Sequence, residues 1–325
     1  MQNHNLLEIK NLRTYFYVRR FVAKAVDNVN LTIKSGETLG LVGESGCGKS
    51  VTAHSIIRLI PDPPGKIESG EILFDGKKLL DLSEYQMRKI RGNQISMIFQ
   101  EPMTSLNPVF PVGDQVAEVI RLHQGLSRSA TRERVIEMFH LVGIPAAETR
   151  LSEYPHQMSG GMRQRVMIAM ALACNPKLMI ADEPTTALDV TIQAQILDLM
   201  NKLKTETGAS ILFITHDLGV IAEMAQNVAV MYAGKVMEYT DVKTLYANPK
   251  NPYTVGLLQS IPVLGRESKG DRLKTISGVV PSLLNLPPGC LYNDRCPDVF
   301  NDCRRVEPEM YQVGDNHLVR CLKYA

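Results

Sequence analysis

The sequence contains no tryptophan among its 325 residues, and aromatic residues make up only 6% of the chain. It has no run of about 18 consecutive apolar residues, so we expect no segment to span a bilayer as a helix. The net charge is only +2 and no long basic run is present, which gives no reason to expect nucleic acid as a partner. The polar start of the chain, residues 1–10, lacks the pattern of a secretory signal peptide, and we therefore expect a cytoplasmic protein.

The length and composition are those of a chain that can bury a large core. Hydrophobic residues account for 44% of the sequence and charged residues for 22%, and 325 residues allow one large domain or two. Six cysteines are present, four of them between positions 290 and 321. Because disulfides are rare in the cytoplasm, this cluster calls for another explanation.

Residues 38–60 form the pattern around which the chain is organised. An apolar run, residues 39–42, enters the glycine-rich turn GESGCGKS, and a helix-like stretch follows until Pro61. Glycines in such a turn let successive backbone N–H groups point inward, and the start of a helix adds a partial positive charge. The spacing G-x-x-x-x-G-K-S between a strand and a helix is typical of a phosphate-binding loop.

This loop predicts a nucleoside triphosphate site. Lys49 can reach the β- and γ-phosphates, and the hydroxyl of Ser50 can ligate Mg²⁺. The alternative is a flexible surface loop with an incidental lysine, which the strand–turn–helix context disfavours. The residues expected to bind nucleotide here are Gly43, Glu44, Ser45, Gly46, Cys47, Gly48, Lys49, Ser50 and Val51.

A second buried strand, KLMIADEP, ends in two carboxylates. Asp182 at the strand tip is placed to hold Mg²⁺, and Glu183 can polarise an attacking water as a general base. Adjacent acids after a strand can also be solvated loop residues, but the phosphate loop upstream favours the catalytic interpretation. The strand ASILFIT ends before His216, which we expect near these carboxylates. Gln100 ends another apolar strand and can direct its amide oxygen towards a metal ion or its bound water.

Two further patterns fit the same chemistry. The segment MSGGMRQR places Ser159, Gly160 and Gly161 at the start of an apolar helix, where they can accept an anion or simply cap the helix. Phe16 and Tyr17 precede the phosphate loop, where an aromatic ring can stack on adenine or fill a sheet face.

Together these segments resemble the ATP-binding subunit of an ABC transporter. The resemblance rests on six motifs in order, namely GESGCGKS as Walker A, Gln100 as the Q-loop, MSGGMRQR as the signature, LMIADEP as Walker B, TTALD with Asp189 as the D-loop, and His216 as the H-loop. The signature reads SGGM where SGGQ is commoner, but Ser159 and Gly161 are unaltered. The resemblance implies an α/β fold with a RecA-like parallel-sheet core, an antiparallel β subdomain and a helical subdomain.

The same resemblance assigns roles to the predicted site residues. Glu183 activates the attacking water, and His216 contacts the γ-phosphate. The Gln100 region moves with nucleotide state and couples to a membrane subunit through the helical subdomain. Phe16 aligns best with the residue that stacks on adenine in the family. Tyr17 is the next residue, and it remains a second candidate for this role. Each ATP·Mg²⁺ would be covered by the signature helix of a partner chain, so one chain alone should hydrolyse ATP poorly.

A narrower resemblance covers nearly the whole chain. The segments FQEPMTSLNPV, NPKNPYTVGLLQSIP and GVVPSLLNLPPGCLYNDRCP look like those of the peptide-importer branch, closest to D-type subunits of dipeptide permeases. The branch implies a homologous F-type ATP-binding partner in a heterodimer, two membrane-spanning permease subunits and, indirectly, an extracytoplasmic peptide-binding protein. The chain would then lie peripherally on the cytoplasmic face of the membrane.

Three functions other than peptide import are alternatives for these motifs. Some members of this branch import nickel chelates or other small solutes. A soluble ABC ATPase acting on nucleic acid is disfavoured because such proteins commonly contain two cassettes or a long coiled-coil insertion. A phosphate-loop kinase is disfavoured by the SGG signature and by His216. We expect an ATP-binding domain over residues 1–240, with a helical subdomain at about 101–175, and a small irregular domain over 241–325.

The four tail cysteines form a pattern of their own. Cys290, Cys296, Cys303 and Cys321 are separated by five, six and seventeen residues, wider than the first pair of a usual structural zinc site. The spacing does not match ferredoxin runs either, so it leaves the metal open. Some members of the importer branch hold a [4Fe–4S] cluster on four such cysteines, and the resemblance favours that cluster over zinc, free thiols or disulfides. Cys47 and Cys174 are expected to be packing residues.

Overall fold

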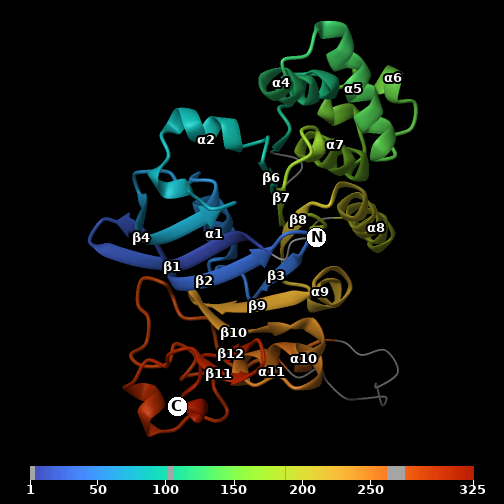
Figure 1. The fold of residues 1–325 in the computed structure, drawn as a ribbon. Helices are drawn as coiled ribbons and strands as arrows, with labels where there is room; N and C mark the ends of the chain where they lie inside the picture. The colour runs from blue at the N-terminus through green and yellow to red at the C-terminus, as the bar shows by residue number, and fades with distance from the viewer. Residues whose placement is uncertain (1–3, 101–104, 187, 262–274) are drawn as a thin grey trace, which may run out of the picture. The chain divides into compact units, whose positions relative to one another are not determined.

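The computed structural model describes residues 4–100, 105–186, 188–261 and 275–325 (Figure 1). The segment that follows Gln100, residues 101–104, lies outside the described residues. The chain divides into two compact units, each assembled from separate stretches of sequence. The first unit consists of Met1–Leu6, Lys34–Glu37 and Asp81–Ile214, and the second of Leu7–Ile33, Thr38–Leu80 and Thr215–Ala325.

The first unit contains three parallel strands. They are β6 (Ile95–Ile98), β7 (Leu178–Asp182) and β8 (Ser210–Thr215), with β7 hydrogen-bonded between the other two. Every residue of β7 and β8 is buried, which explains why both strands read as continuous apolar runs. Parallel strands place their carboxyl ends at one edge, so the residues after β6 and β7 lie close together.

Helices make up most of the rest of the first unit. Ser83 begins the first of them with a capping box, and Ser127, Ser159 and Asp189 each accept a hydrogen bond from a backbone N–H at the start of a later helix. The helices are α2 (Glu84–Ile90), α4 (Val112–Gln124), α5 (Arg128–Leu141), α6 (Ala147–Arg150), α7 (Gly160–Leu172) and α8 (Val190–Thr207). Helices α4 to α7 lie within residues 112–172, and the predicted helical subdomain at about 101–175 stays a prediction.

An antiparallel sheet forms one part of the second unit. Its strand order is β2 (Phe21–Lys34), β1 (Asn5–Val18), β4 (Gly65–Phe74) and β5 (Lys77–Lys78). Strand β1 is continuous and absorbs a register shift between Lys10 and Arg13. Strand β4 begins at Gly65, which pairs with Phe16 of β1.

The remaining strands of the second unit begin with β3, which leads into the phosphate loop. The order is β3 (Thr38–Val42), β9 (Asn227–Tyr232), β10 (Lys235–Asp241), β12 (His317–Val319) and β11 (Tyr311–Gly314), and β3 runs parallel to β9. The tail thus adds two strands to this sheet, and the predicted boundary after residue 240 falls inside β10. Its helices are α1 (Lys49–Ile56), α9 (Leu218–Met224), α10 (Val242–Ala247) and α11 (Pro252–Gln259).

Short 3₁₀ turns complete the described elements. They are η1 (Leu79–Asp81), η2 (Pro155–Gln157), η3 (Asn301–Arg304) and η4 (Leu322–Tyr324). Across the described ranges, each helix is either too short or too polar to traverse a bilayer.

Candidate nucleotide-binding site

The phosphate loop connects β3 to α1 through glycines that no other residue could replace without strain. Gly43 and Gly48 have φ angles of 149° and 108°. A Cβ added at Gly43 would lie 2.1 Å from the carbonyl oxygen of Met231, and one at Gly48 would lie 2.2 Å from that of Ala25. The loop is therefore pressed against neighbouring backbone, which fixes its shape.

Lys49 begins α1 and is buried, with 5% of its surface exposed. Its ammonium group donates hydrogen bonds to the carbonyl oxygens of Gly43, at 2.8 Å, and of Glu44, at 3.3 Å. The lysine therefore bridges the two ends of the loop from inside. Ser50 follows in the first turn of α1, where the helix dipole favours anions. This arrangement fits the triphosphate of a nucleotide.

Glu44 is held by residues of the C-terminal tail, which the sequence did not predict. Arg295 donates two hydrogen bonds to its carboxylate, at 2.8 and 3.0 Å. The backbone N–H of Glu44 donates a third bond to the hydroxyl of Tyr253, at 3.0 Å. Arg295 and Tyr253 gave no sequence signal, because each lies more than two hundred positions from its partner.

The two candidate aromatic residues point to opposite faces of β1, as neighbours in a strand must. Thr14 shares a face with Phe16, and its hydroxyl hydrogen-bonds that of Ser55 in α1 at 2.8 Å. The half-buried ring of Phe16 also lies against Gly65, since a Cβ there would be 2.8 Å from it. Tyr17 is exposed, and its hydroxyl donates to Glu68 at 2.6 Å. Phe16 therefore shares the face that meets the phosphate-loop helix.

The predicted carboxylates follow β7 in the first unit. Asp182 is its last residue and is 2% exposed. Glu183 has a left-handed backbone with φ of 46°, which is strained for a residue with a side chain. Its backbone N–H donates to the carbonyl oxygen of Ile214 at 2.9 Å, so the strained turn is anchored to β8.

The side chain of Glu183 is oriented by two hydrogen bonds. The Gln100 amide nitrogen donates to its Oε2 at 3.0 Å, and the hydroxyl of Thr186 donates to the same oxygen at 3.0 Å. The structure therefore brings Gln100 and Glu183 together, although they are 83 positions apart in the sequence. Thr186 was not among the predicted site residues.

The predicted signature residues begin α7. Ser159 caps this helix, accepting a hydrogen bond from the N–H of Met162 at 3.3 Å. Gly160 and Gly161 form its first turn, and a Cβ at Gly161 would lie 2.8 Å from the side chain of Ile192. The Asp189 carboxylate caps α8, accepting from the N–H of Ile192 at 2.9 Å.

His216 is an exposed residue directly after β8. It belongs to the second unit, with Lys49 and Ser50, whereas Asp182 and Glu183 belong to the first. We predicted that His216 lies near the two carboxylates. Because these residues belong to different units, this stays a prediction.

The four tail cysteines, Cys290, Cys296, Cys303 and Cys321, line one small cavity of about 20 Å³. Burial raises the pKa of the Cys290 thiol to about 11, and the other three thiols add to the shift. Within the described ranges, however, no group of three or more His, Cys, Asp or Glu side chains is placed to hold a metal ion. The predicted cluster is therefore not confirmed. Of the other cysteines, Cys47 is fully buried, as expected of a packing residue, and Cys174 is partly exposed.

Two family models match the chain. The ABC transporter model covers residues 26–186, and the model of the oligopeptide/dipeptide transporter C-terminal region covers residues 237–303. The oligopeptide transport ATP-binding protein AppD of Bacillus subtilis (strain 168) is 51% identical, over 98% of this chain and 97% of that protein. The chain belongs to the ABC transporter family. It is an ATP-binding subunit of that family, and the predicted resemblance is confirmed at this level.

Further relatives and solved structures agree with this membership. The dipeptide transport ATP-binding protein DppD of the same organism is 50% identical, over 97% of this chain and 94% of that protein. A dimeric post-hydrolysis structure of the ATP-binding cassette MJ0796 with ADP and Pi has a TM-score of 0.66 and 32% identity, over 73% of this chain and 98% of that chain. The predicted ABC ATPase fold is therefore confirmed, and the subunit is an ATPase by family.

Proposed function

We propose that this ABC transporter subunit hydrolyses ATP to power the import of dipeptides or oligopeptides. This proposal rests on three features of one chain. They are a phosphate loop, a pair of carboxylates at the end of a strand, and a tail that matches the oligopeptide/dipeptide transporter C-terminal region. AppD and DppD, which are similar over almost the whole chain, are named for oligopeptide and dipeptide transport.

The phosphate-binding groups of the second unit are assigned to ATP. Lys49 binds the β- and γ-phosphates with the backbone N–H groups of residues 43–51. Support comes from the buried lysine, the glycines with positive φ angles and the helix N-terminus at this loop. Phe16 stacks on adenine, since it shares the β1 face that meets α1, while Tyr17 is engaged with Glu68. His216 contacts the γ-phosphate.

The groups of the first unit are assigned to the metal and to the attacking water. Asp182 and Gln100, with Ser50, hold Mg²⁺, which when bound neutralises phosphate charge. Glu183 takes the proton of the attacking water as general base. The hydrogen bonds from Gln100 and Thr186 to its Oε2 orient the carboxylate for that role.

The remaining assignments concern partner chains. Ser159, Gly160, Gly161 and Asp189 act on nucleotide held by a second, homologous ATP-binding subunit of the F type. The exposed serine at the start of α7 supports this, because a helix N-terminus accepts anions. Two permease subunits receive the motion through the helical segment, on the cytoplasmic face of the membrane. An extracytoplasmic binding protein supplies peptide, and no nucleic acid takes part.

The tail is assigned a [4Fe–4S] cluster on Cys290, Cys296, Cys303 and Cys321. The donor chemistry suits it, because four cysteine sulfurs, the usual ligands of iron–sulfur clusters, line one cavity. The predicted division into domains at residue 240 is part of the same proposal.

Reconstitution of the complete transporter in vesicles tests the proposed function. With ATP outside and the peptide-binding protein inside, we expect release of labelled dipeptide from the vesicle lumen and phosphate formation in parallel. The control is the same complex with Lys49→Ala in this chain, which should do neither. Transport of a nickel chelate but of no peptide would contradict the proposed cargo, and ATP hydrolysis stimulated by nucleic acid would contradict the transport function.

A further inference from the structure

A buried ion pair joins the C-terminal tail to the phosphate loop. The Nη1 and Nη2 atoms of Arg295 donate to the two carboxylate oxygens of Glu44 at 2.8 and 3.0 Å. The arginine side chain is only 5% exposed, and that of Glu44 is 27% exposed. A bidentate arginine–carboxylate pair of this kind has a defined geometry and a larger interaction energy than an ordinary surface ion pair. We refer to this contact between Arg295 and Glu44 as the clasp.

The clasp is fixed from the arginine side as well. Arg295 donates through Nε to the carbonyl oxygen of Ser277 at 3.0 Å and through Nη1 to the hydroxyl of Tyr232 at 3.3 Å. Its guanidinium also lies 5.7 Å from the ring centre of Tyr232 and 5.9 Å from that of Tyr292. The arginine therefore has one position, set by the tail and by the end of β9.

The position of Glu44 explains why the clasp matters for nucleotide. Glu44 follows Gly43, and its carbonyl oxygen is one of the two that Lys49 contacts. A carboxylate in a loop that takes a triphosphate repels it, unless a cation neutralises that carboxylate. Arg295 does so, and Tyr253 holds the backbone of the same residue.

We propose that Arg295 is a positioning residue through which the tail sets the affinity of the phosphate loop for ATP. It acts by neutralising Glu44 and holding its side chain away from the phosphates. This inference rests on the proposed nucleotide site. It adds a regulatory contact to that site. Any change in the tail that moves Arg295 away from Glu44 lowers the affinity for ATP.

Equilibrium binding of Mg·ATP to the full-length chain and its variants tests the clasp. Arg295→Gln leaves Glu44 charged and unpaired, and we expect the dissociation constant to rise by about tenfold. Glu44→Gln removes the repulsive charge instead, so this variant should bind at least as tightly as the wild type. The double variant Glu44→Gln/Arg295→Gln should recover most of the affinity lost in Arg295→Gln.

The matched control is Arg304→Gln, because Arg304 is another tail arginine but is exposed and pairs loosely with Asp294 at 3.7 Å. It should bind as the wild type does. A clasp that only stabilises the fold would weaken binding in both single variants, with no recovery in the double variant, and that result would overturn the inference. Unchanged binding by Arg295→Gln would overturn it too. A wild-type chain that binds no nucleotide would instead contradict the proposed function itself.

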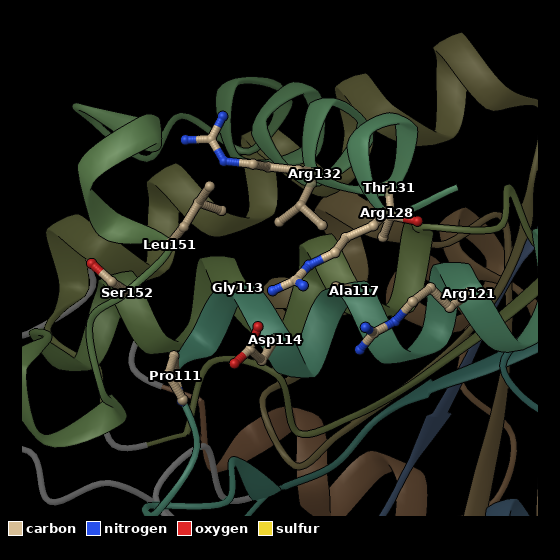
Figure 2. Close-up of a pocket in the computed structure, with 11 residues that line it drawn as sticks. Pro111, Gly113, Asp114, Ala117, Arg121, Arg128, Thr131, Arg132, Leu151 and Ser152 are labelled. Carbon is tan, nitrogen blue, oxygen red and sulfur yellow. The ribbon is translucent and has the colours of Figure 1, made fainter. Parts of the chain in front are cut away.

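A second, independent feature is an arginine-lined pocket of about 300 Å³ in the first unit (Figure 2). Its walls come from α4, α5 and residues 151–152. Gly113, Thr131 and Val135 are buried residues of this lining, while Arg121, Arg128 and Arg132 are exposed. A Cβ at Gly113 would lie 2.6 Å from the carbonyl oxygen of Leu151. The absence of a side chain at Gly113 therefore lets α4 approach the backbone of Leu151 at the wall of the pocket.

The charge of the pocket is unbalanced. Three arginines face one carboxylate, that of Asp114, in the lining. Arg121 and Arg128 form no ion pair with any residue in the described part of the chain, whereas Arg134, also on α5, pairs with Glu137 at 2.7 Å. Figure 2 shows Arg128 extending from α5 towards Gly113 and Asp114 on α4. As the first residue of α5, Arg128 also lies at the positive end of that helix.

We infer that this pocket binds a small organic anion with a phosphate or carboxylate group and an apolar body. Its volume is at the lower end of the range of small-molecule sites, about 300 to 1,000 Å³. Arg128 and Arg121 bind the anionic group, and Val135, Ala117 and Leu151 contact the apolar part.

Phenyl phosphate is the probe for this inference. The full-length chain is first saturated with Mg·ADP, so that the phosphate loop is occupied, and binding is followed by ligand-observed NMR. We expect phenyl phosphate to bind, Arg128→Gln to weaken binding by about fivefold or more, and Arg134→Gln to have no effect. Absence of binding, or binding that Arg128→Gln leaves unchanged, would overturn the assignment.

Discussion

Glu183 combines backbone strain with a fixed side chain. Its φ of 46° lies in the left-handed region, and two donors, Gln100 and Thr186, share one of its oxygens. Strain of this kind persists where the surrounding structure holds it, and it is common where a side chain must be aimed. The carboxylate is therefore oriented before any substrate arrives.

Replacing Glu183 by glutamine tests its role as the general base. Glu183→Gln keeps the size of the side chain and its carbonyl oxygen but cannot take a proton. We expect Mg·ATP binding by the assembled transporter to be retained and phosphate release to fall by about 100-fold or more. Asp198→Asn, on the exposed side of α8, serves as control. Turnover at the wild-type rate in Glu183→Gln would exclude this residue as the base.

A second residue-scale prediction concerns Asp27, which accepts hydrogen bonds from Lys235 and from the hydroxyl of Tyr15, each at 2.8 Å. Burial favours a higher pKa for Asp27, but Lys235 and Tyr15 together hold that pKa below its ordinary value. The charge of Asp27 therefore stabilises the fold above its ordinary pKa of about 4, and this contribution is lost as the pH falls through the folded-state pKa.

Asp27→Asn should accordingly lower the free energy of unfolding by about 1 to 2 kcal/mol at neutral pH, because Lys235 loses one of its two carboxylate partners and keeps Glu307 at 2.6 Å. The difference between variant and wild type should shrink below about pH 4. Chemical unfolding followed by circular dichroism at both pH values measures it. A difference that stays constant with pH would show that the Asp27 charge is not its source.

At the scale of elements, the strand–turn–helix of the phosphate loop, the buried strands and the helical segment could all be predicted from the sequence. Apolar runs and glycine spacing determine them locally. The boundaries of β1 could not, because Asn11 reads as a turn signal. In the structure Asn11 has a φ of 50° inside the strand, and its N–H donates to the side chain of Asn30 at 2.9 Å. The contact with Asn30 of β2 thus keeps β1 continuous at a residue whose local preference is for a turn.

The phosphate loop offers an element-scale prediction with its own matched control. At Gly48 the φ is 108° and an added Cβ would lie 2.2 Å from the Ala25 oxygen, whereas at Gly46 the φ is 76° with open space around it. Gly48→Ala must therefore move backbone. We expect it to weaken Mg·ATP binding by about tenfold or more and to lower Tm, while Gly46→Ala costs only the left-handed strain of about 1 to 2 kcal/mol. Equal effects of the two substitutions would contradict this account of the loop.

At the scale of the whole molecule, two contacts connect the tail to the rest of the second unit. Its strand β12 pairs with β10 through Glu238 and Tyr239, and Arg295 reaches the phosphate loop. Neither contact has a local sequence signal, because each depends on residues far apart in the chain. The motifs that carry the chemistry could be predicted, but the contacts that hold them could not.

The cysteines of the tail give the whole-molecule prediction. After anaerobic purification, the full-length chain should contain about four iron and four sulfide per chain, with broad visible absorbance. Cys303→Ser should lose both, because Cys303 lines the cavity with the other three thiols. Cys174→Ser is the control, since Cys174 lies outside that cavity. One zinc without iron, or neither metal, would contradict the proposed cluster and leave the ATP-binding assignments intact.

The clasp joins residues 251 positions apart. During translation the phosphate loop leaves the ribosome long before Arg295 is made. A nascent chain, or one clipped by a protease after β10, therefore has Glu44 without its counter-charge and binds ATP weakly. Full affinity therefore requires the tail as far as Arg295 to be present and folded against the phosphate loop.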